Sequence, residues 1–211
     1  MKIGTIGAGE AAQAFAEKAI AAGHEILFSN SRGPESLADL VKALGPAASA
    51  GTPAEAARQN LVLFAPPWGK VEASLKGLPD WEGRILLDAT NGLDNGALVD
   101  VGDDSTSEIV ARLAPGARVV KALNASFMTN FREDPVSGDF RRAIFVSSDH
   151  RGAAMDVADL LESFGFAPVY LGSLRTGGRM QAVGATLAGH DFHLPWPAPR
   201  EFPAFNGEAR T

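Results

Sequence analysis

Short, nearly continuous apolar runs alternate along the chain with stretches in which apolar residues return at helical spacing. Residues 61–65 and 84–88 are such runs, which are typical of parallel strands covered on both faces. Earlier in the chain, Leu37, Leu40 and Leu44 mark the apolar side of a helix. Strands that alternate with helices in this way indicate an α/β protein with a doubly wound parallel sheet.

The same pattern sets the bounds of the predicted elements. Strands are expected at residues 3–6, 25–29, 48–50, 61–65, 84–88, 118–123, 142–147 and 167–171. Helices are expected at residues 11–22, 35–45, 70–78, 107–113, 151–164 and 174–188. A further helix begins after Thr52, which forms a capping box with Glu55 and is followed by proline at the first helical position.

The chain is predicted to divide into two parts and a tail. We place a boundary near residue 123, so that residues 1–123 form the first domain and residues 124–194 a smaller C-terminal α/β lobe. Residues 125–139 are too irregular to assign. The tail, residues 195–211, is not expected to form regular structure, because it contains Pro195, Pro197, Pro199 and Pro203.

A strand, a glycine turn and a helix follow one another within the first 22 residues. The turn reads Gly7-x-Gly9-x-x-Ala12. In dinucleotide-binding domains the first glycine of this motif permits a tight turn and the second lets a diphosphate approach the backbone. The third small residue allows the helix to pack closely on the strand. The phosphates would bind the N–H groups that open the helix, here at Glu10 and Ala11, so residues 1–123 are predicted to form a Rossmann domain.

The end of the second predicted strand indicates which dinucleotide binds. Enzymes that prefer NAD usually place an Asp or Glu there to bind the ribose 2′-hydroxyl. This chain has no acid between Ile26 and Pro34, and instead has Asn30, Ser31 and Arg32, which suit a phosphate dianion. We therefore expect NADP(H), although the same residues would also suit a solvated loop.

Candidate residues for the nicotinamide end follow three other strands, because ligands of open α/β sheets lie beyond the carboxyl ends of the strands. Trp68 offers an apolar surface to the cofactor, but a tryptophan in a rigid proline turn could equally pack in the core. The asparagines offer amide groups to a carboxamide or a ring, but could equally cap turns. These candidates are Ala65, Pro66, Pro67, Trp68, Thr90, Asn91 and Asn124.

No proton donor is evident at these strand ends. The single tyrosine, Tyr170, lies within a predicted strand, and Asp88 more readily accepts backbone hydrogen bonds than acts as a base. His190 and His193 have no further metal ligands nearby, so we predict neither a metal site nor a catalytic side chain. Hydride transfer between two stacked planar cofactors fits best, because positioning supplies much of its catalysis.

Composition narrows the class of protein further. The 211 residues include no cysteine, which excludes disulfides and thiolate chemistry and is compatible with the cytoplasm. A net charge of −6 argues against sequence-independent binding of nucleic acid. We see no signal segment and no apolar run long enough to span a membrane. A homodimer is expected only because two-fold pairs are the commonest assemblies.

The order of these motifs resembles that of the coenzyme F420-dependent NADP reductase family, which is related to the cytoplasmic domain of membrane ferric reductases. The resemblance extends to about Phe192. After Gln181, however, the family tends towards a Gly-Pro-Leu run, whereas this chain reads Ala-Thr-Leu-Ala-Gly. The segments that carry the resemblance are Gly7-x-Gly9, residues 29–37, Pro66-Pro67-Trp68, residues 88–91, residues 121–124 and Gly178-Arg179-Met180-Gln181.

The resemblance implies a Rossmann domain and a small C-terminal domain that form a cleft, in which nicotinamide faces a deazaflavin ring. By position it assigns the 2′-phosphate to Ser31 and Arg32, and the two rings to Pro66, Trp68, Asn91 and Asn124. It assigns the second substrate to the 177–179 loop. There Arg175 and Arg179 would contact an anion or simply belong to a solvated helix start.

The sequence therefore predicts an NADP(H)-dependent oxidoreductase that transfers a hydride between nicotinamide and a planar acceptor. The acceptor is expected to be a small molecule, most readily a deazaflavin (coenzyme F420) or a flavin, with a quinone also open. Two alternatives remain: a sensor that binds NADP(H) without turnover, and a reductase of a small carbonyl or imine. A nicotinamide face sealed by side chains would favour the sensor. A His or Lys at the reacting carbon would favour the carbonyl or imine reductase.

Overall fold

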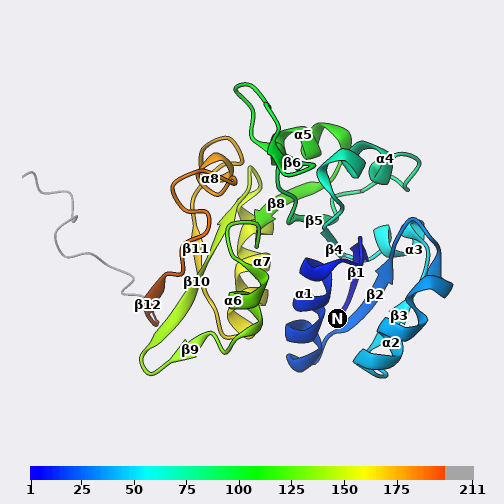
Figure 1. Ribbon diagram of the computed structural model, residues 1–211, viewed down its shortest axis with the longest axis horizontal. Coiled ribbons are helices and arrows are strands. Elements are labelled where there is room, and N and C mark those ends of the chain that lie inside the picture. The colour runs from blue at the N-terminus through cyan, green and yellow to red at the C-terminus, as the bar shows by residue number, and fades with distance from the viewer. Residues whose placement is uncertain (198–211) are drawn as a thin grey trace, which may run out of the picture.

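The computed structural model describes residues 1–197, whose main feature is one large twisted sheet (Figure 1). Its strands lie in the order β11-β10-β8-β5-β4-β1-β2-β3, and β9 and β12 pair with β10. The six strands from β8 to β3 are parallel to their neighbours. The strands are β1 Lys2–Ile6, β2 Glu25–Ser29, β3 Ala48–Ala50, β4 Leu61–Phe64, β5 Ile85–Asp88, β8 Arg118–Ala122, β9 Val136–Ser137, β10 Phe140–Ser147, β11 Ala167–Tyr170 and β12 His193–Pro195.

Helices cover both faces of the sheet, which confirms the predicted doubly wound α/β architecture. One face packs on α1, α2 and α7 around Phe15 and Phe28, and the other packs on α3, α4 and α5 around Phe64 and Leu86. Strand residues alternate between the two clusters, as the pleat requires. The helices are α1 Glu10–Ala21, η1 Pro34–Leu37, α2 Ala38–Leu44, α3 Pro53–Ala57, η2 Trp68–Lys70, α4 Val71–Leu75, α5 Thr106–Leu113, α6 Met128–Arg132, α7 Arg151–Ser163 and α8 Thr176–Met180.

β1 occupies the point at which the order of the sheet reverses. β2 and β3 extend from one side of β1, and β4, β5 and β8 extend from the other. Ligands of doubly wound sheets bind beyond the carboxyl ends of the strands at such a point. A side chain at Gly4 would overlap the carbonyl oxygen of Ala56, so glycine lets α3 pack directly on β1.

The C-terminal part continues the same sheet. β10 runs antiparallel to β8 and parallel to β11, so the parallel arrangement expected from the alternation ends at β8. The sheet thus crosses residue 123, where the sequence places a boundary. The division into domains over residues 1–123 and 124–194 stays a prediction.

Three segments differ from their sequence predictions. The helix expected over residues 174–188 is confined to α8, because Gly184 and Gly189 adopt positive φ values and the chain turns there. The unassigned residues 125–139 contain α6 and β9. Pro195, the first residue of the predicted tail, is the last residue of β12. The tail's remaining prolines, Pro199 and Pro203, lie outside the described residues.

A short hairpin, formed by β6 (Leu93–Asp94) and β7 (Ala97–Leu98), lies beyond the end of β5. Its turn residues, Asn95 and Gly96, both have positive φ values of 49° and 81°. Such a turn is typical of two-residue hairpins. The hairpin had no counterpart in the prediction.

A buried ion pair joins the ends of β5 and β8. Asp88 and Lys121 are both fully buried, and Lys121 Nζ lies 3.6 Å from Asp88 Oδ2. Lys121 also donates to the Thr90 carbonyl oxygen and to Thr106, each at 3.0 Å, while Ser107 and Thr90 donate to Asp88. Burial lowers the pKa of Lys121, and the Asp88 carboxylate opposes that shift. The pair thereby holds the chain that leaves β5 against β8.

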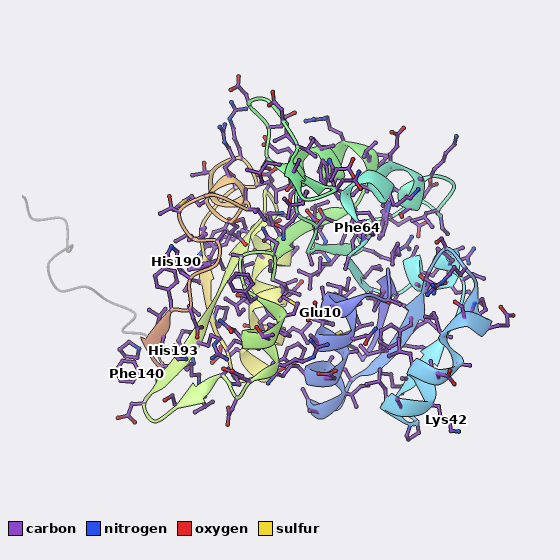
Figure 2. All side chains as sticks on the ribbon, viewed as in Figure 1. Glu10, Lys42, Phe64, Phe140, His190 and His193 are labelled. Atoms are coloured by element: carbon purple, nitrogen blue, oxygen red, sulfur yellow. The ribbon has the colours of Figure 1, made fainter. Side chains whose placement is uncertain are left out.

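We expect Lys121→Met to lower the free energy of unfolding by about 3–5 kcal/mol, because it leaves the Asp88 carboxylate buried without a cation. Chemical denaturation monitored by circular dichroism measures the change. Lys42→Met on the outer side of α2 is the matched control (Figure 2), with an expected effect within about 0.5 kcal/mol. Equal stability of the two variants would contradict a structural role for the pair.

Candidate functional site

A cavity of about 900 Å³ lies at the carboxyl ends of β1, β2, β4 and β5. It therefore lies at the point where the order of the sheet reverses. Most of the residues predicted to bind the cofactor line it. They are Gly7, Gly9, Ala11, Asn30, Ser31, Arg32, Ala65, Pro66, Pro67, Trp68, Thr90 and Asn91.

Three predicted residues are not among those that line the cavity. Ala12 is fully buried and packs in the core, as the close contact of helix and strand requires. The Glu10 side chain is directed to α6, where it pairs with Arg132. Asn124 is 8% exposed and lies behind the wall, in contact with Asn91. Their roles in cofactor binding stay predictions.

The glycine turn has the geometry that the motif requires. Gly7 has a φ of +104°, and a side chain there would place its first carbon 2.7 Å from the Ala65 carbonyl oxygen. Gly9 has no neighbour within 4 Å of such a carbon, so its missing side chain leaves open space at the cavity wall. No side chain caps α1, which leaves its first N–H groups without a side-chain partner.

The loop after β2 is held by its own side chains. Asn30 Oδ1 accepts a hydrogen bond from the Arg32 backbone N–H at 2.9 Å, and Asn30 Nδ2 donates to Ser36 at 2.9 Å. Ser36 also donates to the Gly33 carbonyl oxygen at 2.7 Å. This Asx turn orders the loop while Ser31 and Arg32 remain exposed at the cavity. Within residues 1–197, Arg32 forms no ion pair.

The charged residues that line the cavity are all cations. Its cations are Arg32, Lys70 and Lys76, and no Asp or Glu is among the lining residues. Such a wall favours an anionic ligand. The sequence analysis did not identify Lys70 and Lys76 as residues of the site. A predicted helix over residues 70–78 contained both lysines, but its pattern does not tell which of its polar side chains reach a neighbouring cavity.

Trp68 combines the two environments that the sequence left open, the cofactor cavity and the core. Its side chain is partly buried against the cluster that contains Val71 and Leu75, and it also lines the cavity. Pro66 is buried and Pro67 exposed, so the proline turn presents one side to the core and one to solvent. The loop after β4 therefore forms a firm apolar wall.

The loops after β5 and β8 form a hydrogen-bonded set at the other end of the cavity. Asn91 Nδ2 donates to the Asn124 carbonyl oxygen at 3.2 Å, and Asn124 Nδ2 donates to Asn91 Oδ1 at 3.2 Å. Asn124 also donates to the Gln181 carbonyl oxygen at 2.8 Å, so these amides connect the cavity wall to α8. Gln181 is fully buried and donates to Ser147 at 2.7 Å. The sequence analysis had named Gln181 only as part of the segment Gly178-Arg179-Met180-Gln181, which carries the family resemblance.

The remaining candidates lie elsewhere. Asp88 is fully buried in the pair with Lys121, which does not suit a base that reaches a substrate. Tyr170 donates to the Ser148 carbonyl oxygen. Arg179 donates to the Asp103 carbonyl oxygen at 2.9 Å, and Arg175 is exposed.

His190 and His193 lie at the edge of the molecule formed by β10 and β12 (Figure 2). The His190 ring packs 5.7 Å from that of Phe192. Across residues 1–197, no cluster of three or more His, Asp or Glu side chains could hold a metal ion. Over the same range, no helix has the length and apolar character needed to cross a membrane.

Comparison with known proteins identifies relatives over almost the whole chain. The family described as "NADP oxidoreductase coenzyme F420-dependent" matches residues 2–92. Hypothetical protein SMa0349 from Sinorhizobium meliloti is 35% identical, and its structure superposes with a TM-score of 0.85 over 91% of this chain and 95% of that one. A candidate F420-dependent NADP-reductase from Arthrobacter sp. FB24 is 28% identical, with a TM-score of 0.75 over 86% of this chain and 89% of that one.

A curated relative is a longer protein. Metalloreductase STEAP3 of Rattus norvegicus is 28% identical over 183 residues, which are 86% of this chain. The chain covers only 36% of the length of that protein. The family match, the relatives, the glycine turn and the cationic cavity agree. The chain belongs to the NADP oxidoreductase, coenzyme F420-dependent family.

Proposed function

We propose that the protein is an NADP(H)-dependent oxidoreductase that transfers a hydride between nicotinamide and a planar acceptor. The observation that carries the proposal is the cavity at the glycine turn, whose wall holds Arg32, Lys70 and Lys76 but no carboxylate. NADP(H) carries a diphosphate and a 2′-phosphate, and its charge matches this wall. The volume of about 900 Å³ also suits a large ligand.

The residues present fit NADP(H) along its length. The open space at Gly9 and the uncapped start of α1 suit the diphosphate. The exposed Ser31 and Arg32, on a loop ordered by Asn30, suit the 2′-phosphate. Trp68, Thr90 and Asn91 then lie towards the nicotinamide.

Positioning is the contribution that the chain makes to the reaction. Bound NADPH supplies a hydride, and an acceptor ring must lie against its reacting carbon. The proline turn and Trp68 form one wall for the rings, and Asn91, held by Asn124, offers an amide at the other end. The cavity-lining residues include no His, Tyr, Asp or Glu, so Lys70 and Lys76 are the lining side chains that could protonate a carbonyl or imine substrate.

Coenzyme F420 or a flavin is the acceptor that we propose. The family description and the Arthrobacter relative both refer to F420, and the absence of acid groups along the cavity wall suits a deazaflavin or flavin ring. A homodimeric state and a cytoplasmic location remain predictions that rest on composition and general frequency.

Anaerobic oxidation of NADPH, followed by its absorbance, tests the function with a panel of acceptors. We expect turnover with coenzyme F420 or a flavin and much slower turnover with quinones. Binding of NADPH without turnover on any acceptor would contradict hydride transfer and favour a sensor. Turnover confined to a small ketone or imine would favour the third alternative.

Arg32→Ala is expected to weaken NADPH binding by about 1–3 kcal/mol, because it removes charge-assisted hydrogen bonds to the 2′-phosphate. NADH lacks that phosphate, so its affinity should stay nearly unchanged. Isothermal titration calorimetry with both cofactors measures the two affinities. An equal loss for NADPH and NADH would remove the assignment of Arg32 to the 2′-phosphate.

Gly9→Val and Gly7→Val are expected to differ in what they damage. At Gly9 the added side chain enters open space at the cavity, so both cofactors should lose binding while the melting temperature stays near that of the original protein. At Gly7 the side chain meets the Ala65 backbone at a positive φ, so the fold itself should lose stability. Thermal melts and cofactor titrations separate the two effects. Retained binding in Gly9→Val would show that the turn does not hold the diphosphate.

A further inference from the structure

Glu10 brings a carboxylate into the turn that the proposed diphosphate approaches. It follows Gly9 directly and is the first residue of α1. The helix macrodipole favours a negative charge there, but that charge competes with a bound phosphate for the same positive end. Gly9 and Ala11 line the cavity, whereas Glu10 does not. The Glu10 side chain is therefore directed away from the cavity, although the residues on both sides of it in the chain line that cavity.

Arg132, the last residue of α6, holds Glu10 in this position. Its Nη1 lies 3.3 Å from Glu10 Oε1, and its Nε lies 3.1 Å from Glu17 Oε2. Nη2 also points to the Glu10 carbonyl oxygen, at 3.5 Å. In Figure 2, Glu10 lies at the end of α1 on the side that faces α6. One guanidinium thus bridges two carboxylates of α1.

The position of Arg132 is fixed by the residues around it. Its neighbour Phe131 is fully buried and stacks on Phe166, with ring centroids 4.7 Å apart. Arg142, itself 5% exposed, binds the carbonyl oxygen of Asn130 and pairs with Glu133 at 2.9 Å. These contacts fix the residues that precede Arg132 and the residue that follows it. The Arg132 side chain is 32% exposed, less than the side chain of either glutamate that it binds.

We propose that Arg132 is a positioning residue for the dinucleotide: it draws the Glu10 carboxylate towards α6 and neutralises it, which leaves the opening of α1 to the diphosphate. The inference rests on the proposed function. It concerns a part of the cofactor that NADPH and NADH share. Arg132 therefore differs from Arg32, whose effect is confined to NADPH.

A double-mutant cycle of Arg132→Met and Glu10→Gln tests this inference. At low ionic strength, Arg132→Met should raise the dissociation constants of NADPH and NADH alike, by about 2- to 5-fold for a pair of this exposure. In the Glu10→Gln background, which keeps the backbone N–H but removes the charge, Arg132→Met should have no further effect. Arg132→Lys should retain most of the affinity.

Arg118→Met is the matched control, because it also removes one partly exposed positive charge but lies at the start of β8, at the amino ends of the parallel strands, whereas the cavity lies at their carboxyl ends. Its dissociation constants should be unchanged. If Arg132→Met weakens binding equally with Glu10 and with Gln at position 10, Arg132 acts through its own charge or through the fold, and the inference is overturned. If the original protein binds neither cofactor, the proposed function fails as well.

Discussion

The approach of β1 to the loop after β4 at Gly7 is the constraint on which the rest of the site depends. A side chain at Gly7 would meet the Ala65 carbonyl oxygen at 2.7 Å, and the residue adopts a φ of +104°. Its N–H donates to the Ser29 carbonyl oxygen at 3.0 Å, which ties the turn to β2. Only glycine meets both conditions at little cost. The ends of β1, β2 and β4 can then surround one cavity, with the start of α1 beside it.

Folding separates the acidic groups of this edge from the cavity. The chain carries a net charge of −6, yet no carboxylate is among the residues that line the cavity. Asp88 is buried against Lys121, and Glu10 is bound to Arg132. The cations Arg32, Lys70 and Lys76 remain at the cavity wall. An acidic protein can in this way offer a locally positive site, because a charge acts mainly over about a Debye length.

Local signals account for the elements that were predicted well and for one that was missed. β2 and β3 have the predicted bounds, because apolar runs bounded by turn residues are a local property. Asn95-Gly96 is a strong local hairpin signal, but the strands beside it have only two residues each and no apolar alternation. The helix expected over residues 174–188 is limited to α8, because Gly184 and Gly189 adopt positive φ values, which the apolar spacing used for the prediction does not reveal.

The sequence by itself determined the strand and helix order, the glycine turn at Gly7 and Gly9, and the loop with Arg32 in place of an acid, since each rests on neighbouring residues. Only the tertiary structure decided that Lys70 and Lys76 line the cavity, that Asn124 lies behind Asn91, and that Arg132 holds Glu10. Arg132 and Glu10 are 122 residues apart. Contacts of that kind depend on how α6 and α1 pack, and packing arises from the whole core rather than from any local pattern.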